Sequence, residues 1–446
     1  MYVCEVAGGR VADPVTFALD TDWNLHEHLG GHGPWIAHTA GTVDSDLDGA
    51  CVIDQVHMLA RHAERYPTTS VGRDMAALVE HLAGAGASGP LAFVSSWRPF
   101  LFDPARQLEE LTRTGPHAGT ASAFAAGVSF ASRYAHLHNV SSTDVPVNVF
   151  SCTCGRVRDT AALFAAGFFG LDSASHSLVQ IPDRDPARGG DTLTPGKACP
   201  AYLADGDAGR PHAKRLTRAY LADALAPAAA RIGAASGVNL TAHDVFTMHE
   251  LCAFELLARD RSPWCSVFEP ADWDTFEYSR DLLHYYRSGP GTPYAVPLGR
   301  QYVEATSALL ADGPAAGSLF FSFAHDGDLL PVLTALGLFG HEHMPAHHVQ
   351  PDRLWRTSSL VPMAARIVIE RSTCASGPGV RILVNDGALP LPGCPADPAA
   401  WCPLDTFLAE IGKRLDTAPS FADACGLSPD VPSAISFLRQ PAQASL

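Results

Sequence analysis

The sequence predicts an α/β protein, built on a doubly wound sheet that carries an inserted, mainly α-helical smaller domain. Apolar runs typical of strands alternate with helical periodicity at both ends of the chain, as in doubly wound sheets. Polar residues with catalytic potential follow three of these runs, at the strand ends where such sheets bind ligands. Between residues 214 and 312 the pattern is helical throughout, which indicates the insertion.

The expected elements follow in chain order from these patterns. Strand-like runs occupy residues 51–59, 145–150, 318–323, 365–370 and 379–384. The helical patterns of the middle region cover residues 214–232, 242–258, 272–286 and 297–311. Stretches rich in Pro and Gly near 183–212 and 288–292 indicate the borders of the insertion. We therefore expect a discontinuous α/β domain, residues 1–200 and 295–446, and a helical domain over 201–294.

The composition describes a well-cored globular protein with an acidic balance. Of its 446 residues, 47% are hydrophobic and 17% are charged, and the net charge is −16. This balance argues against nucleic acid and anionic membranes as partners, because both require basic surfaces. No apolar run is long enough to span a bilayer. Most of the permanently charged basic residues are arginines, since the lysines are only Lys197, Lys214 and Lys413.

A basic motif follows the first strand. Residues 61–67 read Arg-His-Ala-Glu-Arg-Tyr-Pro, so Arg61 and Arg65 bracket His62 where the strand ends. Guanidinium groups present a rigid fork of donors that matches phosphate oxygens and stays charged at any working pH. A histidine between two such forks faces the anion that they bind, which makes His62 a candidate nucleophile toward phosphorus. The alternative interpretation is a solvated basic turn that ends at Pro67.

The motif resembles the signature of the histidine acid phosphatases (branch 2), in the form typical of fungal and yeast-type secreted acid phosphatases and phytases. Two further stretches carry the same resemblance. The strand at 318–323 is followed by His325 and Asp326, and Arg156 follows the strand at 145–150 and precedes an Asp-Thr-Ala sequence. The resemblance covers nearly the whole chain and implies a phosphoglycerate-mutase-like form of the fold with the same helical insertion.

The resemblance also implies a role for each of these residues, with no cofactor and no metal. Three arginines would clamp the phosphate oxygens: Arg61, Arg65 and Arg156. His62 would attack in line and form a phosphohistidine, and His325 would hydrogen-bond the phosphoryl group. Asp326 would protonate the leaving alcohol and then serve water as a base.

Three neighbouring residues bear on this assignment. Arg158 is also basic, but the family's Asp-Thr-Ala stands at the offset that matches Arg156. Asp328 is a second acid near the His-Asp pair, and we interpret it as a charge at a helix N-terminus. Ala63 stands where the family usually has glycine, so its methyl group would crowd the phosphate, or strain the turn if its φ is positive.

The cysteines and two sequons indicate an oxidising compartment. Eleven cysteines without paired zinc-type motifs favour disulfides, and Asn139 and Asn239 each begin a glycosylation sequon. We therefore expect a secreted glycoprotein whose signal peptide is absent from this chain, because the residues after Met1 lack an apolar signal core. The resemblance implies four disulfides: Cys51 with Cys374, Cys199 with Cys425, Cys252 with Cys265, and Cys394 with Cys402.

Three cysteines and two groups of histidines stay outside these assignments. The cysteines are Cys4, Cys152 and Cys154, and their odd number means that at least one is free or bonded to another chain. The histidines are His26, His28, His32 and His38, and His341, His343, His347 and His348. Either group can bind a metal such as zinc. We interpret both as loop histidines, because neither has the spacing of a helical metal motif.

These observations predict a secreted, cofactor-independent acid phosphatase that hydrolyses phosphomonoesters. A phytase is the alternative within the class. Phytases of the family often carry several lysines after the first motif, whereas the stretch after Pro67 holds one basic residue, Arg73, which favours small monophosphates. A phosphate-binding protein without turnover is the alternative of another class, but pure binding does not need the His-Asp pair. The sequence leaves the natural substrate and the oligomeric state open.

Overall fold

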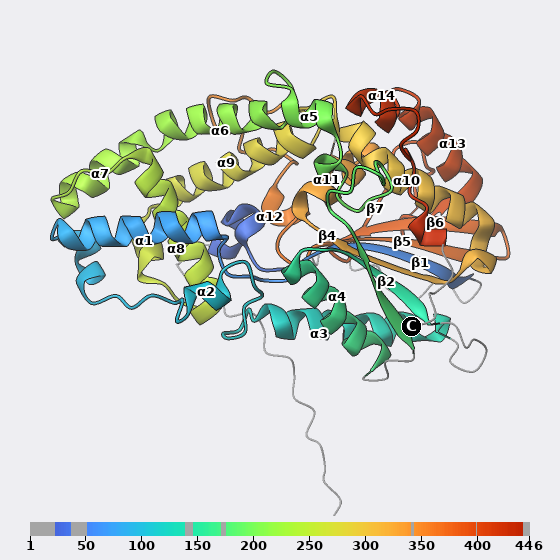
Figure 1. The fold of residues 1–446 in the computed structure, drawn as a ribbon, viewed down its shortest axis with the longest axis horizontal. Helices are drawn as coiled ribbons and strands as arrows, with labels where there is room; N and C mark the ends of the chain where they lie inside the picture. Colours follow the sequence, from blue (N-terminus) through green and yellow to red (C-terminus); the bar gives the residue numbers. More distant parts are fainter. Residues whose placement is uncertain are drawn as a thin grey trace, which may run out of the picture.

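The centre of the protein is an eight-stranded sheet in the order β3-β2-β4-β1-β5-β6-β7, with β8 paired to β6 (Figure 1). The computed structural model describes residues 23–36, 51–138, 146–170, 175–339, 343–397 and 399–439. The strands are β1 Cys51–Arg61, β2 Val147–Cys152, β3 His176–Ile181, β4 Leu319–Ala324, β5 Arg366–Cys374, β6 Gly377–Val384, β7 Gly387–Leu389 and β8 Cys402–Pro403.

The strands that matter for function are parallel neighbours. β4 pairs with β1 on one side and with β2 on the other, and its register sets Ala324 opposite Arg61. The carboxyl ends of β1, β4 and β2 therefore meet at one edge of the sheet, where ligands bind in sheets of this kind. Beyond β1, the strands from β5 onward extend the sheet antiparallel.

Helices cover both faces of the sheet, which confirms the predicted α/β class (Figure 1). The α-helices of the described residues are α1 Thr69–Gly84, α2 Pro104–Gln107, α3 Gly119–Tyr134, α4 Gly155–Phe169, α5 Pro200–Ala204, α6 Arg210–Ala224, α7 Ala226–Ser236, α8 Ala242–Arg259, α9 Pro270–Ser288, α10 Ala295–Asp312, α11 Asp326–Ala335, α12 Thr357–Leu360, α13 Leu404–Leu415 and α14 Phe421–Cys425. In Figure 1, α3 and α4 lie on one face, and α10, α11 and α13 on the other.

Each face of the sheet has its own core, because successive side chains of a strand point to opposite sides. Met58 and Phe321 pack toward α3 and α4 with Phe164. Leu59 and Phe320 join the opposite core, which contains residues of α10, α11 and α13. The strands are thus buried on both faces, which explains their nearly continuous apolar sequences.

The helical part of the molecule draws on two separate stretches of the chain. Helices α6 to α9 lie between β3 and β4 in sequence, where the insertion is predicted. One buried cluster, however, joins α7, α8 and α9 to α1 and to the residues up to Phe100, and these helices form one end of the molecule in Figure 1. The division into domains at residues 201 and 294 stays a prediction.

Two expectations about single elements are wrong. The helix expected over residues 214–232 is two helices, α6 and α7, which meet at Leu225. Pro227 lies in the first turn of α7, and because proline has no N–H it favours a new helix start over continuation. The expected strands also omitted the short strands β7 and β8 and the strand β3, a partly exposed edge strand in which polar and apolar residues mix.

The described residues contain four disulfides, and they are the pairs that the family resemblance implies: Cys51 with Cys374, Cys199 with Cys425, Cys252 with Cys265, and Cys394 with Cys402. The first joins β1 to β5 at directly paired positions. Of the predicted glycosylation sites, Asn239 is exposed, whereas Asn139 lies outside the described residues, as do Cys4, His38 and His341. Among the described helices, none combines the length and the apolar character that crossing a membrane requires.

We predict that the disulfides differ in their contribution to stability. Cys51 and Cys374 are 323 residues apart, and Cys394 and Cys402 are 8 apart. Since a crosslink restricts the unfolded chain more when it closes a longer loop, replacing Cys51 and Cys374 by alanine lowers the free energy of unfolding by about 4 kcal/mol, against about 2 kcal/mol for the short bridge. Guanidinium unfolding of the two double variants measures this. Equal losses would contradict the loop-length argument.

Candidate active site

The six residues predicted for the site come from the ends of three neighbouring strands. Arg61 is the last residue of β1, and His62 follows it. Arg156 lies in the first turn of α4, which starts three residues after β2 ends. His325 caps the N-terminus of α11, directly after β4, and Asp326 is its first helical residue. The structure brings these groups together: the rings of His62 and His325 lie 5.9 Å apart, edge to face.

Arg61 is buried and fixed on three sides. Its Nη1 donates to the carbonyl oxygens of Gly31 and Val361, at 2.5 and 2.6 Å. Its Nη2 donates to Oδ2 of Asp326 at 3.0 Å. Burial lowers the pKa of Arg61, whereas the Asp326 carboxylate raises it. These bonds hold the guanidinium in one orientation beside His62.

His62 is held as a neutral imidazole. Its Nδ1 lies 2.9 Å from the carbonyl oxygen of Ala63. A carbonyl only accepts, so Nδ1 carries the proton and Nε2 keeps a free lone pair. Burial, followed by repulsion from Arg61 and Arg156, holds the pKa of His62 well below its usual value. The imidazole therefore remains unprotonated at acidic pH, where a solvent-exposed histidine carries a charge.

Arg65, in the loop after β1, and Arg156, in α4, both lie near His62 and act on it electrostatically. Arg65 donates to the carbonyl oxygen of Tyr66 at 2.8 Å, and its guanidinium lies 5.5 Å from the ring centroid of Phe254 in α8. Burial, with repulsion from Arg156 and Arg61, lowers the pKa of Arg65 to about 9. Arg156 forms an ion pair with Glu109 at 3.0 Å. Three cations this close repel one another, so an anion among them is strongly favoured.

His325 is oriented by Asp328, one turn into α11. Oδ2 of Asp328 accepts from the backbone N–H of His325 and lies 3.1 Å from its Nδ1. Although burial lowers the pKa of His325, the interactions with Asp328 and a hydrogen bond with Cys154 outweigh it, and the pKa is raised. Asp328 is thus a helix N-terminal charge, as the sequence indicates, and it also turns Nε2 of His325 into a proton-bearing donor. This second role is not evident from the sequence.

Asp326 is ionised in the free protein. Burial raises the pKa of its carboxyl, but Arg61, His284 and Arg287 together hold it well below its usual value. Its Oδ2 lies 3.8 Å from Nε2 of His284, and its Oδ1 accepts from the backbone N–H of Gly327 at 2.7 Å. The acid expected to donate a proton is therefore a carboxylate in the free protein.

Helix α9 supplies three basic residues that the sequence analysis missed. Arg280, His284 and Arg287 follow one another at i, i+4 and i+7, and so lie on one face of the helix. All three act electrostatically on Asp326 or on Arg61. A methyl group at Gly327 would come within 3.2 Å of Nη2 of Arg287, which shows how closely α9 approaches the start of α11. The spacing was visible in the sequence, but the surface that this face covers was not.

Ala63 causes no strain. It is absent from the non-glycine residues with positive φ, so the strained turn considered from the sequence is wrong. The methyl group is fully buried and packs with Leu111 and Ala123. The backbone N–H of Ala63 donates to Oγ1 of Thr160 at 3.0 Å, which ties the loop after β1 to α4.

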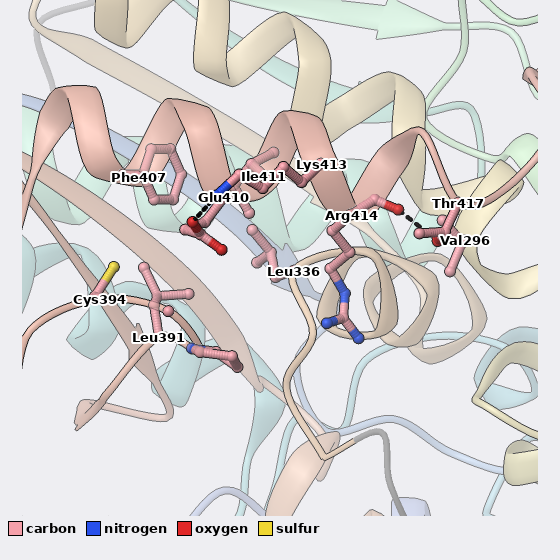
Figure 2. A pocket seen from close by; sticks show the side chains of 12 residues that line it. Val296, Leu336, Leu391, Cys394, Phe407, Glu410, Ile411, Lys413, Arg414 and Thr417 are labelled. Carbon is pink, nitrogen blue, oxygen red and sulfur yellow. Dashed lines mark hydrogen bonds and ion pairs between the residues drawn. The ribbon is translucent and has the colours of Figure 1, made fainter.

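A hollow in the surface lies away from these groups. It has a volume of about 380 Å³ and lies along α13, next to Leu336 and the loop at Cys394 (Figure 2). Figure 2 shows Glu410 paired with Lys413 on the same helix, at 2.5 Å. None of the predicted site residues lines it, so the catalytic groups and this hollow are separate features.

The fold and the site define a histidine phosphatase. The sequence matches the histidine phosphatase superfamily (branch 2) over residues 52–385, and the chain belongs to this family. It is 34% identical to acid phosphatase PHO1 of Komagataella pastoris over 430 residues, which cover 93% of this chain and 89% of that protein. It is 30% identical to phytase PHO112 of Candida albicans over 423 residues, 93% of this chain and 90% of the relative.

A solved structure agrees with these relatives. The phytase from D. castellii superposes with a TM-score of 0.85 at 28% identity, over 93% of this chain and 90% of that one. Membership of the family makes this protein a phosphoric monoester hydrolase that works through a phosphohistidine. The alternative of a phosphate-binding protein without turnover is thereby set aside.

We predict that Asp328 acts through the charge of His325. Asp328→Asn keeps an acceptor for the N-terminus of α11 but removes the carboxylate that raises the pKa of His325. The protonated imidazole is then lost at lower pH, so the alkaline limb of the kcat/KM profile moves toward acid, with a loss of about tenfold at neutral pH.

Asp244→Asn is the matched control for this variant. Asp244 closes an equivalent capping box at the start of α8, with Thr241. Both variants lose a similar amount of helix-capping energy, about 1 kcal/mol, but only Asp328→Asn moves the pH profile. Identical pH profiles for the two variants and the unmodified enzyme would show that Asp328 is only a helix cap.

Proposed function

We propose that this protein is an acid phosphatase in which His62 is the nucleophile, held among Arg61, Arg65 and Arg156. One observation carries the proposal: Nδ1 of His62 is bound to a backbone carbonyl, so Nε2 is unprotonated in the middle of three cations. Such a site attracts a phosphoryl group and leaves the nucleophile free at acidic pH.

The first step transfers the phosphoryl group to His62. The arginines bind its oxygens, and Nε2 of His62 attacks phosphorus while the bond to the ester oxygen breaks. The electron pair stays on the leaving oxygen, which takes a proton from Asp326. His325, charged through its bond to Asp328, stabilises the oxygens of the transferring group.

The second step returns the enzyme to its starting state. A water molecule attacks the phosphohistidine, Asp326 accepts its proton, and the P–N bond breaks to restore the lone pair of Nε2. Asp326 must be protonated for the first step, although the free enzyme holds it as a carboxylate. A bound phosphate is an anion beside this carboxylate and satisfies Arg61, so it raises the pKa of Asp326. Acidic pH then supplies the proton.

We propose small phosphomonoesters as the preferred substrates and phytate as the second candidate. The stretch after Pro67 is poor in basic residues, which favours small substrates. Helix α9 favours phytate, because its Arg280 and Arg287 add positive charge next to the three phosphate-binding arginines. Arg210 and Lys214 of α6 interact electrostatically with Arg287 and extend this charge. One relative is named an acid phosphatase and another a phytase.

An extracellular location is also part of the proposal. Disulfides form and persist in oxidising compartments and are rare in reducing ones. The four disulfides therefore favour an extracellular location. The exposed Asn239 stands in a sequon directly before α8, where a glycan meets solvent.

We predict that His62→Ala abolishes hydrolysis and phosphoenzyme formation. Rapid quench with labelled p-nitrophenyl phosphate traps an acid-labile phosphohistidine in the unmodified enzyme and none in the variant. Asp326→Asn provides the contrast: nitrophenolate leaves without protonation, so the intermediate forms and accumulates because its hydrolysis lacks a base. His81→Ala, an exposed histidine of α1, keeps full activity. Activity of the unmodified level in His62→Ala would refute the assignment.

We predict that kcat/KM for a small aryl or alkyl monophosphate exceeds that for phytate by at least about tenfold, which corresponds to roughly 1.4 kcal/mol of transition-state preference. The comparison is made at several acidic pH values with the same enzyme preparation. Arg287→Ala and Lys214→Ala test the opposing charge, since either change lowers the phytate rate more than the monophosphate rate. A preference for phytate would assign the protein to the phytases.

A further inference from the structure

Two cysteines outside the disulfides lie next to His325. Cys152 is the last residue of β2 and is buried, and Cys154 is the N-cap of α4 and is partly exposed. Both thiols are free. Sγ of Cys152 lies 3.9 Å from Nδ1 of His325. One ligand atom from each of Cys152, Cys154 and His325 can be chosen so that all three lie within 4.8 Å of one another.

The donor set favours a soft or borderline cation. Two sulfurs and an imidazole nitrogen are typical ligands of Zn²⁺ and Cd²⁺, whereas Mg²⁺ and Ca²⁺ prefer oxygen. In a tetrahedral zinc site with bonds of about 2.3 Å, sulfur ligands lie ~3.8 Å apart. The distances between the three ligand atoms therefore exceed those of a tetrahedral zinc site by about 1 Å at most. Closing the site therefore requires shifts of the ligand atoms of only about 1 Å.

A fourth ligand stands beside the cluster. Oδ2 of Asp183, which follows β3, lies 3.5 Å from Sγ of Cys154. It is held there by Nζ of Lys197 at 2.6 Å. Asp183 or a water molecule can complete a tetrahedral site, and the part-exposed Cys154 gives a cation a way in from solvent.

We propose that Cys152, Cys154 and His325 form an inhibitory site for a soft divalent cation such as Zn²⁺ or Cd²⁺. Binding displaces the thiol protons and the Nδ1 proton into solvent, and the metal forms bonds to both sulfurs and to Nδ1. His325 then loses its bond to Asp328 and is drawn toward β2, away from the phosphoryl group. The inhibitory effect rests on the proposed role of His325, whereas the binding itself rests only on the three ligands.

The binding test uses the purified protein and CdCl₂. Ultraviolet titration at pH 6 shows a thiolate-to-cadmium absorption band that saturates at one equivalent. A moderately acidic to neutral pH is needed because protons compete with the metal for thiol and imidazole. The band disappears in the Cys152→Ser, Cys154→Ser double variant. Its persistence in that variant, or its absence from the unmodified protein, would overturn the proposal.

The inhibition test uses ZnCl₂ with p-nitrophenyl phosphate. Zn²⁺ inhibits the unmodified enzyme, EDTA restores it, and MgCl₂ at the same concentration has no effect. The double serine variant keeps its activity without metal and needs at least about tenfold more Zn²⁺ for half-inhibition. His28→Gln is the matched control, because His28 belongs with Asp274 and Glu277 to the other candidate metal cluster of the described residues. We expect the His28→Gln variant to be half-inhibited at the same Zn²⁺ concentration as the unmodified enzyme.

Three outcomes of the inhibition test contradict the proposal. Equal sensitivity of the double serine variant would place the inhibitory metal elsewhere, and a loss of sensitivity in His28→Gln would place it at the other cluster. Activity restored by a thiol reductant but not by EDTA would identify a Cys152–Cys154 disulfide in place of a metal site. The cadmium titration of His62→Ala keeps the two proposals apart, since it reports the site even if the catalytic assignment fails.

Discussion

The buried guanidinium of Arg61 is the interaction on which the rest of the site depends. A cation at this depth costs several kcal/mol unless its donors are satisfied. Here the carbonyl oxygens of Gly31 and Val361 and the carboxylate of Asp326 accept hydrogen bonds from its two terminal nitrogens, while Nε has no partner among the described residues. These partners come from three separate parts of the chain, and the parallel pairing of β1 with β4 places Asp326 beside Arg61. The site and the sheet are therefore one structure, and neither is complete alone.

The same charge sets the protonation states of both catalytic groups. It lowers the pKa of His62, together with burial and Arg156, and it lowers the pKa of Asp326 against the effect of burial. The first shift is useful at acidic pH, since it keeps the nucleophile free. The second opposes proton donation until phosphate binds. A substrate anion relaxes the second shift by occupying the guanidinium, so binding and proton transfer are coupled through Arg61.

Sequence reasoning located the groups whose chemistry is local. The motif after β1, the His-Asp pair after β4 and Arg156 after β2 were predicted because each follows a recognisable strand, and parallel strands bring such ends together. Arg280, His284 and Arg287 were missed for a physical reason. Helical spacing reveals that they share a face, but the surface that α9 covers depends on packing between residues far apart in sequence. By contrast, the break between α6 and α7 is determined by the local sequence, because Pro227 favours the start of a new helix.

The net charge of the chain is a poor guide to the field at the site. The protein carries −16 overall, yet Arg61, Arg65 and Arg156 converge on one place, with the basic face of α9 beside them. A low-dielectric cleft lined by one sign of charge concentrates the potential of the nearest groups, while distant acidic side chains are screened over about 10 Å at ordinary salt. An acidic protein can therefore hold a polyanion. What distinguishes small phosphoesters from phytate is whether cations lie beyond the clamp, at the distance of a second phosphate. Under the proposed function, Arg287 of α9 and the α6 residues that interact with it electrostatically are the candidates for this role.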